Sequence, residues 1–522
     1  MSGAFNLLDE PWLPVRLVDR RVVDFSLREV LARSSEIVAL AETEPPNLVA
    51  QHRLLLAIVH RALTLEIGNW KVKDRVRWYR EGLPTAVLDA YLEQWRDRFW
   101  LFHPEFPFMQ AAVLATAEET RDKYKPWTQI SLASASGNMP VVFDHAYDGA
   151  PKAISPASAV RTLLGFLQFT PGGLVKTLRD ADKAGALANT AAVIPIGSTL
   201  AQTLVLGLHP PARQHAEPDL PAWELAPLTL AQLRGAPVLA TGANDRYTRL
   251  SRAVLFVPEK DGNIRWLRFA AGWALGEDAN APDPMAAFRA GSNGLVRLTF
   301  NGGRAMWRDL PALLPNPDPK PGEDSRAPAV LNSAVSLHEE ISDERVYQPL
   351  LVAGLASDQA KLLRWRSEQI SLPVALLQNA ERAAYLRTLV ERAETLFKDI
   401  NNLAVRMLAE TLPDSDSKDT RGRARSLLET GMFSASYFAA AERALVQILQ
   451  LLGEGQFEGA DECWDSILRR SALLAWGHVV ADMGFLPRAL RANAKFLPRF
   501  HGLLNKHVPL INPPSSRKEI AA

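Results

Sequence analysis

The sequence predicts an α+β protein of two domains, a mixed N-terminal domain followed by a C-terminal antiparallel four-helix bundle. The chain has 522 residues, 47% of them hydrophobic, which is more than one hydrophobic core usually supports. Short strand signals mix with helices of moderate length over residues 1–365. From about residue 380 onward, apolar residues recur at helical spacing. We therefore place the two domains at 1–365 and 366–522.

The strand signals of the N-terminal domain are short apolar runs with Gly, Pro, Asn or Asp near an end. They cover residues 12–17, 141–143, 203–208, 253–257 and 296–300. Around the first run, Pro11 and Pro14 predict an edge strand or an extended segment, because proline cannot donate a ladder hydrogen bond. Helices are predicted over 48–67 and 87–99. Strands and helices do not alternate regularly and no repeat occurs, which indicates an α+β arrangement.

The C-terminal domain is predicted to consist of long helices. A stripe of apolar residues spaced by three and four runs from Tyr385 to Met407 along one helix. Further helices are predicted over 434–452, 463–483 and 487–504, the last one kinked at Pro498. Four helices that each carry an apolar stripe bury it as an antiparallel bundle. The polar run over 414–423 is predicted to be an exposed loop.

Charge and cysteine content exclude several classes of protein. The net charge is +1, so any contact with nucleic acid must come from a local patch or be supported by a partner. Cys463 is the only cysteine in the sequence, which excludes an internal disulfide and a paired-cysteine zinc site. The sequence contains no apolar run long enough for a membrane span and no signal peptide. We expect a cytoplasmic protein that does not bind membranes.

A search of the sequence for catalytic or metal-binding motifs finds none. Phosphate-binding glycine loops, nucleophile elbows and zinc-protease motifs do not occur in the sequence. His52 and His60 are two helical turns apart, too far to share a metal, and we expect them at a helix surface. Neighbouring Asp144 and His145 point to opposite faces of an extended segment, and the acids around Cys463 suit a helix N-terminus. We therefore expect no catalytic residue, metal or cofactor.

Three segments have residue types that suit contact with nucleic acid. Adjacent Gly172 and Gly173, after Pro171, allow a close approach of the backbone to a ligand, although a tight turn is the commoner use of such a pair. The strand-like segment 263–269 carries two arginines, and a run of four basic residues spaced by three and four lies on the last helix. A solvated surface is the commoner explanation for both sets. The basic residues are Arg265, Arg268, Arg488, Arg491, Lys495 and Arg499.

Two segments resemble the CasA family, the large subunits of the type I-E CRISPR surveillance complex called Cascade. They are the stretch NLLDEPWLPVR at 6–16 and the stretch HPEFPFMQ at 103–110. The resemblance covers nearly the whole chain. It implies a non-catalytic protein that recognises the protospacer-adjacent motif (PAM) of double-stranded DNA and begins the duplex opening that forms an R-loop. The implied partners are the other Cascade subunits with their guide RNA, the target DNA, and a nuclease-helicase recruited for antiviral defence.

The resemblance also implies roles for individual residues. The loop at 171–173 resembles the glycine loop that enters the PAM minor groove, and Arg265 or Arg268 matches a basic residue that reaches the same groove. Gln359, beside Asp358, resembles the glutamine wedge that displaces the first base pair. The segment 137–150 resembles a long loop that docks toward the guide RNA, with Phe143 and Asn138 as its candidate contacts. The basic run on the last helix is then a candidate contact for DNA downstream of the PAM.

Two other functions fit the sequence without this resemblance. One is an enzyme with an unfamiliar active site built from Asp144, His145 and His103. The other is an architectural adaptor that uses its helical bundle and contacts no nucleic acid.

Overall fold

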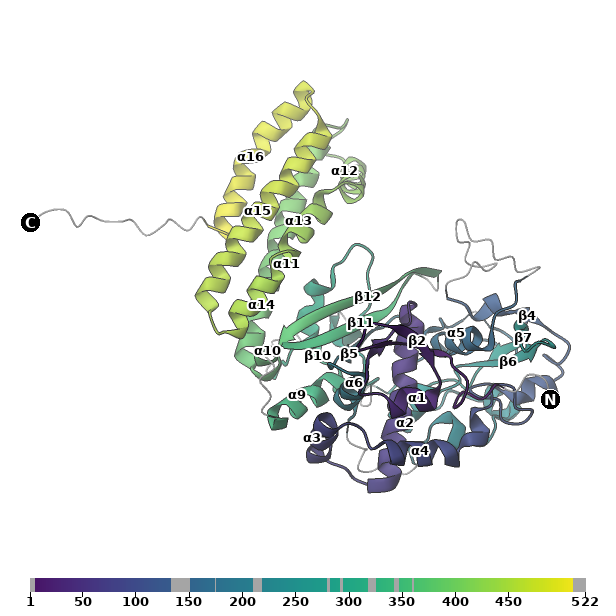
Figure 1. Ribbon diagram of the computed structural model, residues 1–522. Helices are drawn as coiled ribbons and strands as arrows, with labels where there is room; N and C mark the ends of the chain where they lie inside the picture. The colour runs from purple at the N-terminus through teal and green to yellow at the C-terminus, as the bar shows by residue number, and fades with distance from the viewer. Residues whose placement is uncertain are drawn as a thin grey trace, which may run out of the picture. The chain divides into compact units, whose positions relative to one another are not determined.

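The computed structural model describes residues 5–132, 151–173, 175–209, 218–278, 282–291, 294–317, 325–341, 347–358 and 361–509 (Figure 1). The chain divides into two compact units. Unit 1 comprises Met1–Gly302 and Pro319–Ser371, and unit 2 comprises Gly303–Asp318 and Leu372–Ala522. Small sheets and helices together form unit 1, and the described part of unit 2 is helical, so the predicted α+β class is confirmed.

The first sheet of unit 1 has the order β2-β1-β3, with β1 (Leu13–Leu17) between β2 (Val22–Phe25) and β3 (Ile37–Leu40). The expectation of an edge strand here was therefore wrong, because the segment forms the central strand. Pro14 is tolerated because it contributes its carbonyl oxygen, which accepts a hydrogen bond of 2.7 Å from the amide of Ala41. The paired residues of β1 and β3 begin only after it, at Val15. Trp12 is fully buried beside this sheet, and its indole Nε1 donates to the carbonyl of Leu7.

Helix α2 (Pro45–Ile67) confirms the helix predicted over 48–67 and contacts elements on several sides. Its neighbours include α4 (Thr85–Gln94), α5 (Pro156–Phe169), α6 (Leu200–Gly207), α8 (Ala243–Thr248) and β11 (Tyr347–Asp358). Because these elements cover the helix, the placement of His52 and His60 at a helix surface was wrong. The two side chains are only 4% and 6% exposed, and burial lowers the pKa of each to about 4.

The remaining strands of unit 1 form three more three-stranded sheets within the described residues, with the orders β4-β7-β6, β10-β8-β9 and β12-β11-β5. The predicted strand at 253–257 is confirmed as β6, whereas the one at 296–300 overlaps only the end of β9 and the one at 141–143 lies outside the described residues. The strands are β4 (Lys125–Pro126), β5 (Ala191–Pro195), β6 (Arg252–Pro258), β7 (Ile264–Ala271), β8 (Phe288–Gly291), β9 (Gly294–Arg297), β10 (Ser325–Arg326) and β12 (Lys361–Pro373).

The predicted strand at 203–208 was wrong, since this segment forms α6. The hydroxyl of Thr199 accepts a hydrogen bond of 3.3 Å from the amide of Gln202 and caps the start of the helix. Almost every residue of α6 is buried, so its apolar run shows no helical period. The other helices of unit 1 are α1 (Leu27–Ala32), α3 (Val72–Glu81), α7 (Leu230–Arg234) and α9 (Ala329–Ile341), and the segment predicted helical at 87–99 divides into α4 and a 3-10 turn (Arg96–Phe99).

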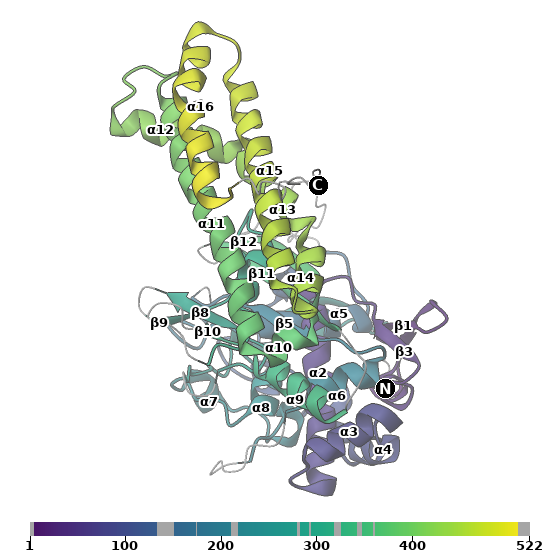
Figure 2. The same cartoon turned by 90° about the vertical axis from the view of Figure 1, so that its left-hand side faces the viewer.

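Unit 2 is dominated by three long helices that contact one another, α11 (Ala380–Ala409), α15 (Phe457–Met483) and α16 (Pro487–His507) (Figure 2). The predicted helix at 434–452 is two consecutive helices, α13 (Phe433–Glu442) and α14 (Leu445–Gly453), which both contact α15. Part of the predicted loop at 414–423 belongs to α12 (Lys418–Thr430), because the hydroxyl of Ser417 caps the amide of Thr420. A short helix, α10 (Val374–Gln378), precedes α11. Among the described helices, none combines the length and apolar content of a membrane span.

Candidate nucleic-acid interface

The predicted glycine loop leaves the end of α5 and returns to β5. Its two sides are joined by backbone hydrogen bonds, from Gly185 to the carbonyl of Thr170 at 2.8 Å and from Gly173 to the carbonyl of Asp182 at 3.1 Å. These bonds close a short stem below the residues at the tip. At the far end, the amide of Ala271 on β7 donates to the carbonyl of Thr177 at 3.1 Å. The loop is thus held at its stem and again near its tip.

The two glycines serve different purposes in this stem. A Cβ atom on Gly172 would lie 3.0 Å from the backbone nitrogen of Ala184, so a side chain at this position would push the two sides of the stem apart. Gly173 has a φ of 85°, which L-residues rarely adopt, and a Cβ atom here would meet no other atom within 4 Å. Gly172 is therefore needed for packing, while Gly173 is exposed and offers its backbone to a ligand.

A buried arginine that the sequence analysis missed joins both sides of the stem. Arg252, the first residue of β6, donates to the carbonyl of Lys183 at 2.6 Å and also to the carbonyl of Pro171. The same guanidinium lies 2.6 Å from a carboxylate oxygen of Asp182, and both side chains are 1% exposed. Burial lowers the pKa of Arg252 to about 10, so it remains charged at neutral pH. The residues it joins are distant in sequence, so no local pattern indicates the contact.

Two exposed lysines give this loop a positive charge. Lys176 lies near the tip and Lys183 lies on the returning side, and neither has an ion-pair partner among the described residues. Arg179 is held by carbonyl groups instead, at 2.5 Å from Leu233 and 3.4 Å from Gly272. A loop with a fixed backbone and two free ammonium groups is suited to a phosphate-lined groove.

The two candidate arginines on β7 differ in how their charge is balanced. Arg265 forms an ion pair of 2.7 Å with Glu259. Arg268 instead donates to the carbonyl of Arg121 at 3.1 Å and lies 5.1 Å from the ring of Tyr124, with no carboxylate partner among the described residues. It is also three residues from Ala271, about 10 Å along the strand from the contact with the glycine loop. Arg268 is therefore the better placed of the two to contact a phosphate.

The predicted wedge follows β11. The segment at 354–358 belongs to this strand, and Gln359 lies outside the described residues. A Cβ atom on Gly354 would lie 2.2 Å from the carbonyl oxygen of Thr190 and 3.5 Å from the ring of Phe169. These two residues stand just before and just after the glycine loop. Asp358 is four residues further along, about 13 Å from this contact.

The basic run on α16 occupies one face of that helix. Its four residues are exposed, while Ala489, Ala492, Phe496 and Phe500 on the other face are buried. Lys495 forms an ion pair with Glu410, which partly balances its charge. The helix continues through Pro498 as one element. The exposed residues are Arg488, Arg491, Lys495 and Arg499.

Of the remaining candidate residues, His103 lies within the described part of the chain. Phe143, Asn138, Asp144 and His145 lie outside the described residues. His103 accepts hydrogen bonds on its Nδ1 from the amides of residues 105 and 106, at 3.1 and 2.9 Å, so it caps a turn. Among the described residues, no three His, Cys, Asp or Glu side chains are grouped as a metal site would require.

Comparisons with known proteins find relatives over nearly the whole chain. Residues 6–475 match the family model of CRISPR-associated protein Cse1. The chain is 34% identical over 523 residues to the CRISPR-associated protein CasA/Cse1 of Thermus thermophilus, covering 96% of this chain and 97% of the relative. A crystal structure of a CRISPR-associated protein from the same organism superposes with a TM-score of 0.82 and 31% identity, covering 96% and 99% of the two chains.

The same fold occurs in a chain of a CRISPR RNA-guided surveillance complex, with a TM-score of 0.72 and 24% identity over 96% of this chain and 99% of that one. The family match covers most of the sequence and includes both segments that carried the resemblance. The chain therefore belongs to the Cse1 (CasA) family, the large subunits of the CRISPR Cascade surveillance complex.

Proposed function

We propose that this subunit recognises the PAM in double-stranded DNA and begins the local opening of the duplex. The observation that supports the proposal most strongly is the position of β11 relative to the glycine loop. Gly354 of β11 is in contact with Phe169 and Thr190, the residues that flank the loop. The loop that would read the PAM is therefore anchored at the same place as the strand that leads to Gln359. Gln359 would displace the adjacent base pair.

The energetics of duplex opening suit such an arrangement. Unstacking a base step costs about a few kcal/mol, and an inserted side chain offsets part of that cost. The exchange of DNA pairing for guide-RNA pairing is nearly balanced overall, so a small local contribution decides where the exchange begins. A rigid loop in the minor groove, which distinguishes mainly A·T from G·C pairs, would tolerate several PAM sequences.

The charge of the chain fits a subunit that acts inside a larger assembly. With a net charge of +1, the isolated protein lacks the field that draws an independent DNA-binding protein to its target. We propose that the other subunits and their guide RNA supply most of the affinity. In this proposal the subunit is not an enzyme, and it helps recruit the nuclease-helicase that degrades the target.

The proposal is tested with Arg252→Lys in the reconstituted complex. Lysine keeps a positive charge near Asp182 but cannot bridge the carbonyls of Pro171 and Lys183 together, so the stem loosens. We expect about a tenfold loss of affinity for linear DNA with a PAM and little change for DNA without one, measured by equilibrium binding. The control is Arg234→Lys, whose arginine pairs with Glu119 at the surface. Unchanged PAM discrimination in a folded Arg252→Lys complex would contradict the role of the loop.

A further inference from the structure

The stretch 103–110, which helped to identify the family, forms part of a cavity that the proposed function leaves unused. The cavity has a volume of about 60 Å³, space for roughly four to six water-sized spheres. The walls come from four parts of unit 1. Their residues are 98 with 105–110, then 222, 223 and 225–228, then 245 and 248–250, and finally 273. They are mostly apolar and strongly aromatic, and the main contributors are Phe106, Phe108, Met109, Trp223, Leu228 and Trp273.

One wall of the cavity contains a buried arginine with an unused donor. Arg249 is 3% exposed and is oriented by Asp245, whose carboxylate accepts from its Nε at 2.7 Å. The guanidinium carbon lies 3.8 Å from the centre of the Trp273 ring. Its Nη1 atom is buried and has no hydrogen-bond partner among the described residues. A buried N–H group of this kind is normally paired, so the cavity offers a position for a hydrogen-bond acceptor.

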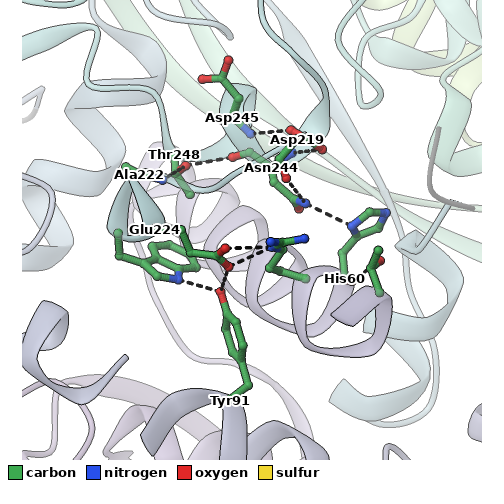
Figure 3. A network of polar contacts seen from close by, with 11 residues as sticks. His60, Tyr91, Asp219, Ala222, Glu224, Asn244, Asp245 and Thr248 are labelled. Atoms are coloured by element: carbon green, nitrogen blue, oxygen red, sulfur yellow. Dashed lines mark hydrogen bonds and ion pairs between the residues drawn. The ribbon is translucent and has the colours of Figure 1, made fainter. Parts of the chain in front are cut away.

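The ion pair that orients Arg249 is itself fixed by the surrounding network. The backbone amide of Asp245 donates to the carboxylate of Asp219 at 2.9 Å. Figure 3 shows this bond and shows the side-chain carboxylate of Asp245 pointing away from the network. In the same network, the carboxylate of Glu224 accepts from the hydroxyl of Tyr91 at 2.6 Å. Arg249 is therefore preorganised, and a ligand would not have to order it.

A second arginine adds positive charge to the walls. Arg98 stacks on Phe106, with its guanidinium carbon 3.9 Å from the ring centre, and donates to the carbonyl of Leu225 at 3.3 Å. No carboxylate pairs with Arg98 among the described residues, whereas Arg249 is balanced by Asp245. Glu105 also lines the cavity, but it is exposed, so solvent screens its charge. The walls therefore carry one positive charge without a carboxylate partner among the described residues, which suits a monoanion.

We propose that this cavity binds a carboxylate carried on a short apolar stem. The carboxylate would accept from Nη1 of Arg249 and interact with the charge of Arg98, while the stem would lie against Phe106 and Trp273. The small volume and apolar walls favour a carboxylate over a phosphate. Two sources share this chemistry, a free short-chain acid and the carboxyl terminus of a protein chain. The inference does not depend on the proposed role in DNA recognition.

The test observes the cavity directly by nuclear magnetic resonance. The chain contains eight methionines, and labelling their methyl groups with ¹³C places a probe at Met109, assigned with Met109→Leu. Propionate is titrated into the full-length protein, with propionamide as a neutral ligand of the same shape. We expect propionate to shift the Met109 signal with a Kd of about 1 to 10 mM, as its few atoms allow, and propionamide to bind at least about tenfold more weakly.

Variants and peptides complete the test. Arg98→Gln removes the charge at a partly exposed position and should weaken propionate binding about tenfold, and Arg249→Lys should do the same if circular dichroism shows it folded. Arg121→Gln, at an exposed position outside the cavity, should bind as the wild type does. N-acetylglycylvaline serves as a model of a chain terminus. If it binds more tightly than propionate, and its C-terminal amide does not bind, the source is a chain terminus. If it binds more weakly than propionate, the source is a free acid. A Met109 signal unmoved by propionate, or moved equally by propionamide, would overturn the proposal and leave a cavity that holds water only.

Discussion

Unit 1 contains several completely buried ion pairs besides its surface pairs, whereas the ion pairs in the described part of unit 2 all stay partly exposed. In unit 1, Arg53 and Asp283 form a pair of 2.8 Å with both side chains 0% exposed, and Arg252 with Asp182 is almost as deeply buried. In unit 2, the side chain of Arg392 pairs with Asp465 while remaining 24% exposed. A buried ion pair must keep its geometry, because a buried charge that loses its partner is strongly destabilising. In unit 1 a few buried charges hold the backbone in place, as Arg252 does at the glycine loop. In unit 2 apolar contacts hold the helices together, and the paired charges remain in contact with solvent.

The largest expected effect is on the buried pair of unit 1. Arg53→Met leaves the carboxylate of Asp283 buried without its main partner, and we expect a loss of about 3 to 5 kcal/mol in the free energy of unfolding. Arg392→Met in unit 2 should cost about 1 kcal/mol or less, because its carboxylate partners reach solvent. Urea denaturation monitored by hydrogen exchange in α2 and in α15 would measure the two effects. Equal losses would contradict the comparison.

Acid should destabilise unit 1 more than unit 2. His52 and His60 have pKa values lowered to about 4 by burial, while in the unfolded chain they titrate near 6.5. Between these values the unfolded chain binds more protons, so stability that is complete above pH 6.5 is lost as the pH falls toward 4. From pH 7 to pH 5 we expect a loss of about 2 kcal/mol for each histidine.

Amide exchange in α2 and α15 at pH 7 and pH 5, corrected for intrinsic rates, would measure this difference. In His52→Gln, the loss in α2 should be smaller by about 2 kcal/mol, the contribution of one histidine. An equal loss in the variant and the wild type would show that other groups cause the acid sensitivity.

The smallest effect on stability is expected at the exposed face of α16. Changing Arg491 and Arg499 to Gln together should alter the free energy of unfolding by no more than about 0.5 kcal/mol, because neither forms an ion pair among the described residues. If this face binds DNA in the complex, affinity should fall and the salt dependence of binding should decrease by about one ion for each phosphate that is no longer neutralised. Changing Arg421 and Arg423 on α12 to Gln provides a control on another exposed helix.

Local patterns in the sequence predicted elements that have one buried face or a clear period. Helix α11 and strand β6 were predicted for this reason. The segment at 203–208 was read as a strand because α6 is buried on nearly all sides and shows no period. His52 was placed at a surface because nothing in the sequence indicated how many neighbours cover α2. Pro14 led to the prediction of an edge strand, because proline lacks an amide donor. Its carbonyl oxygen alone is enough for a place in a central strand.

Some residues of the candidate site could be predicted from the sequence and others could not. The resemblance to a family directed attention to Gly172 and Gly173, and the structure explains why both are glycine. The resemblance could not indicate Arg252. This residue lies 81 residues after Pro171 in the sequence, so no local pattern links it to the loop. The ion pair of Arg265 with Glu259, which favours Arg268 as the phosphate contact, also depends on side-chain geometry that spacing does not determine.

The proposed opening of the duplex next to the PAM can be measured with a fluorescent base. A 2-aminopurine base placed at the first target position of a linear duplex becomes more fluorescent when it is unstacked. With the wild-type complex we predict an increase that requires the PAM, and with Gln359→Ala we predict that most of this increase is lost. The control is Gln378→Ala, at the last residue of α10. An increase without a PAM, or an equal increase with Gln359→Ala, would contradict the account.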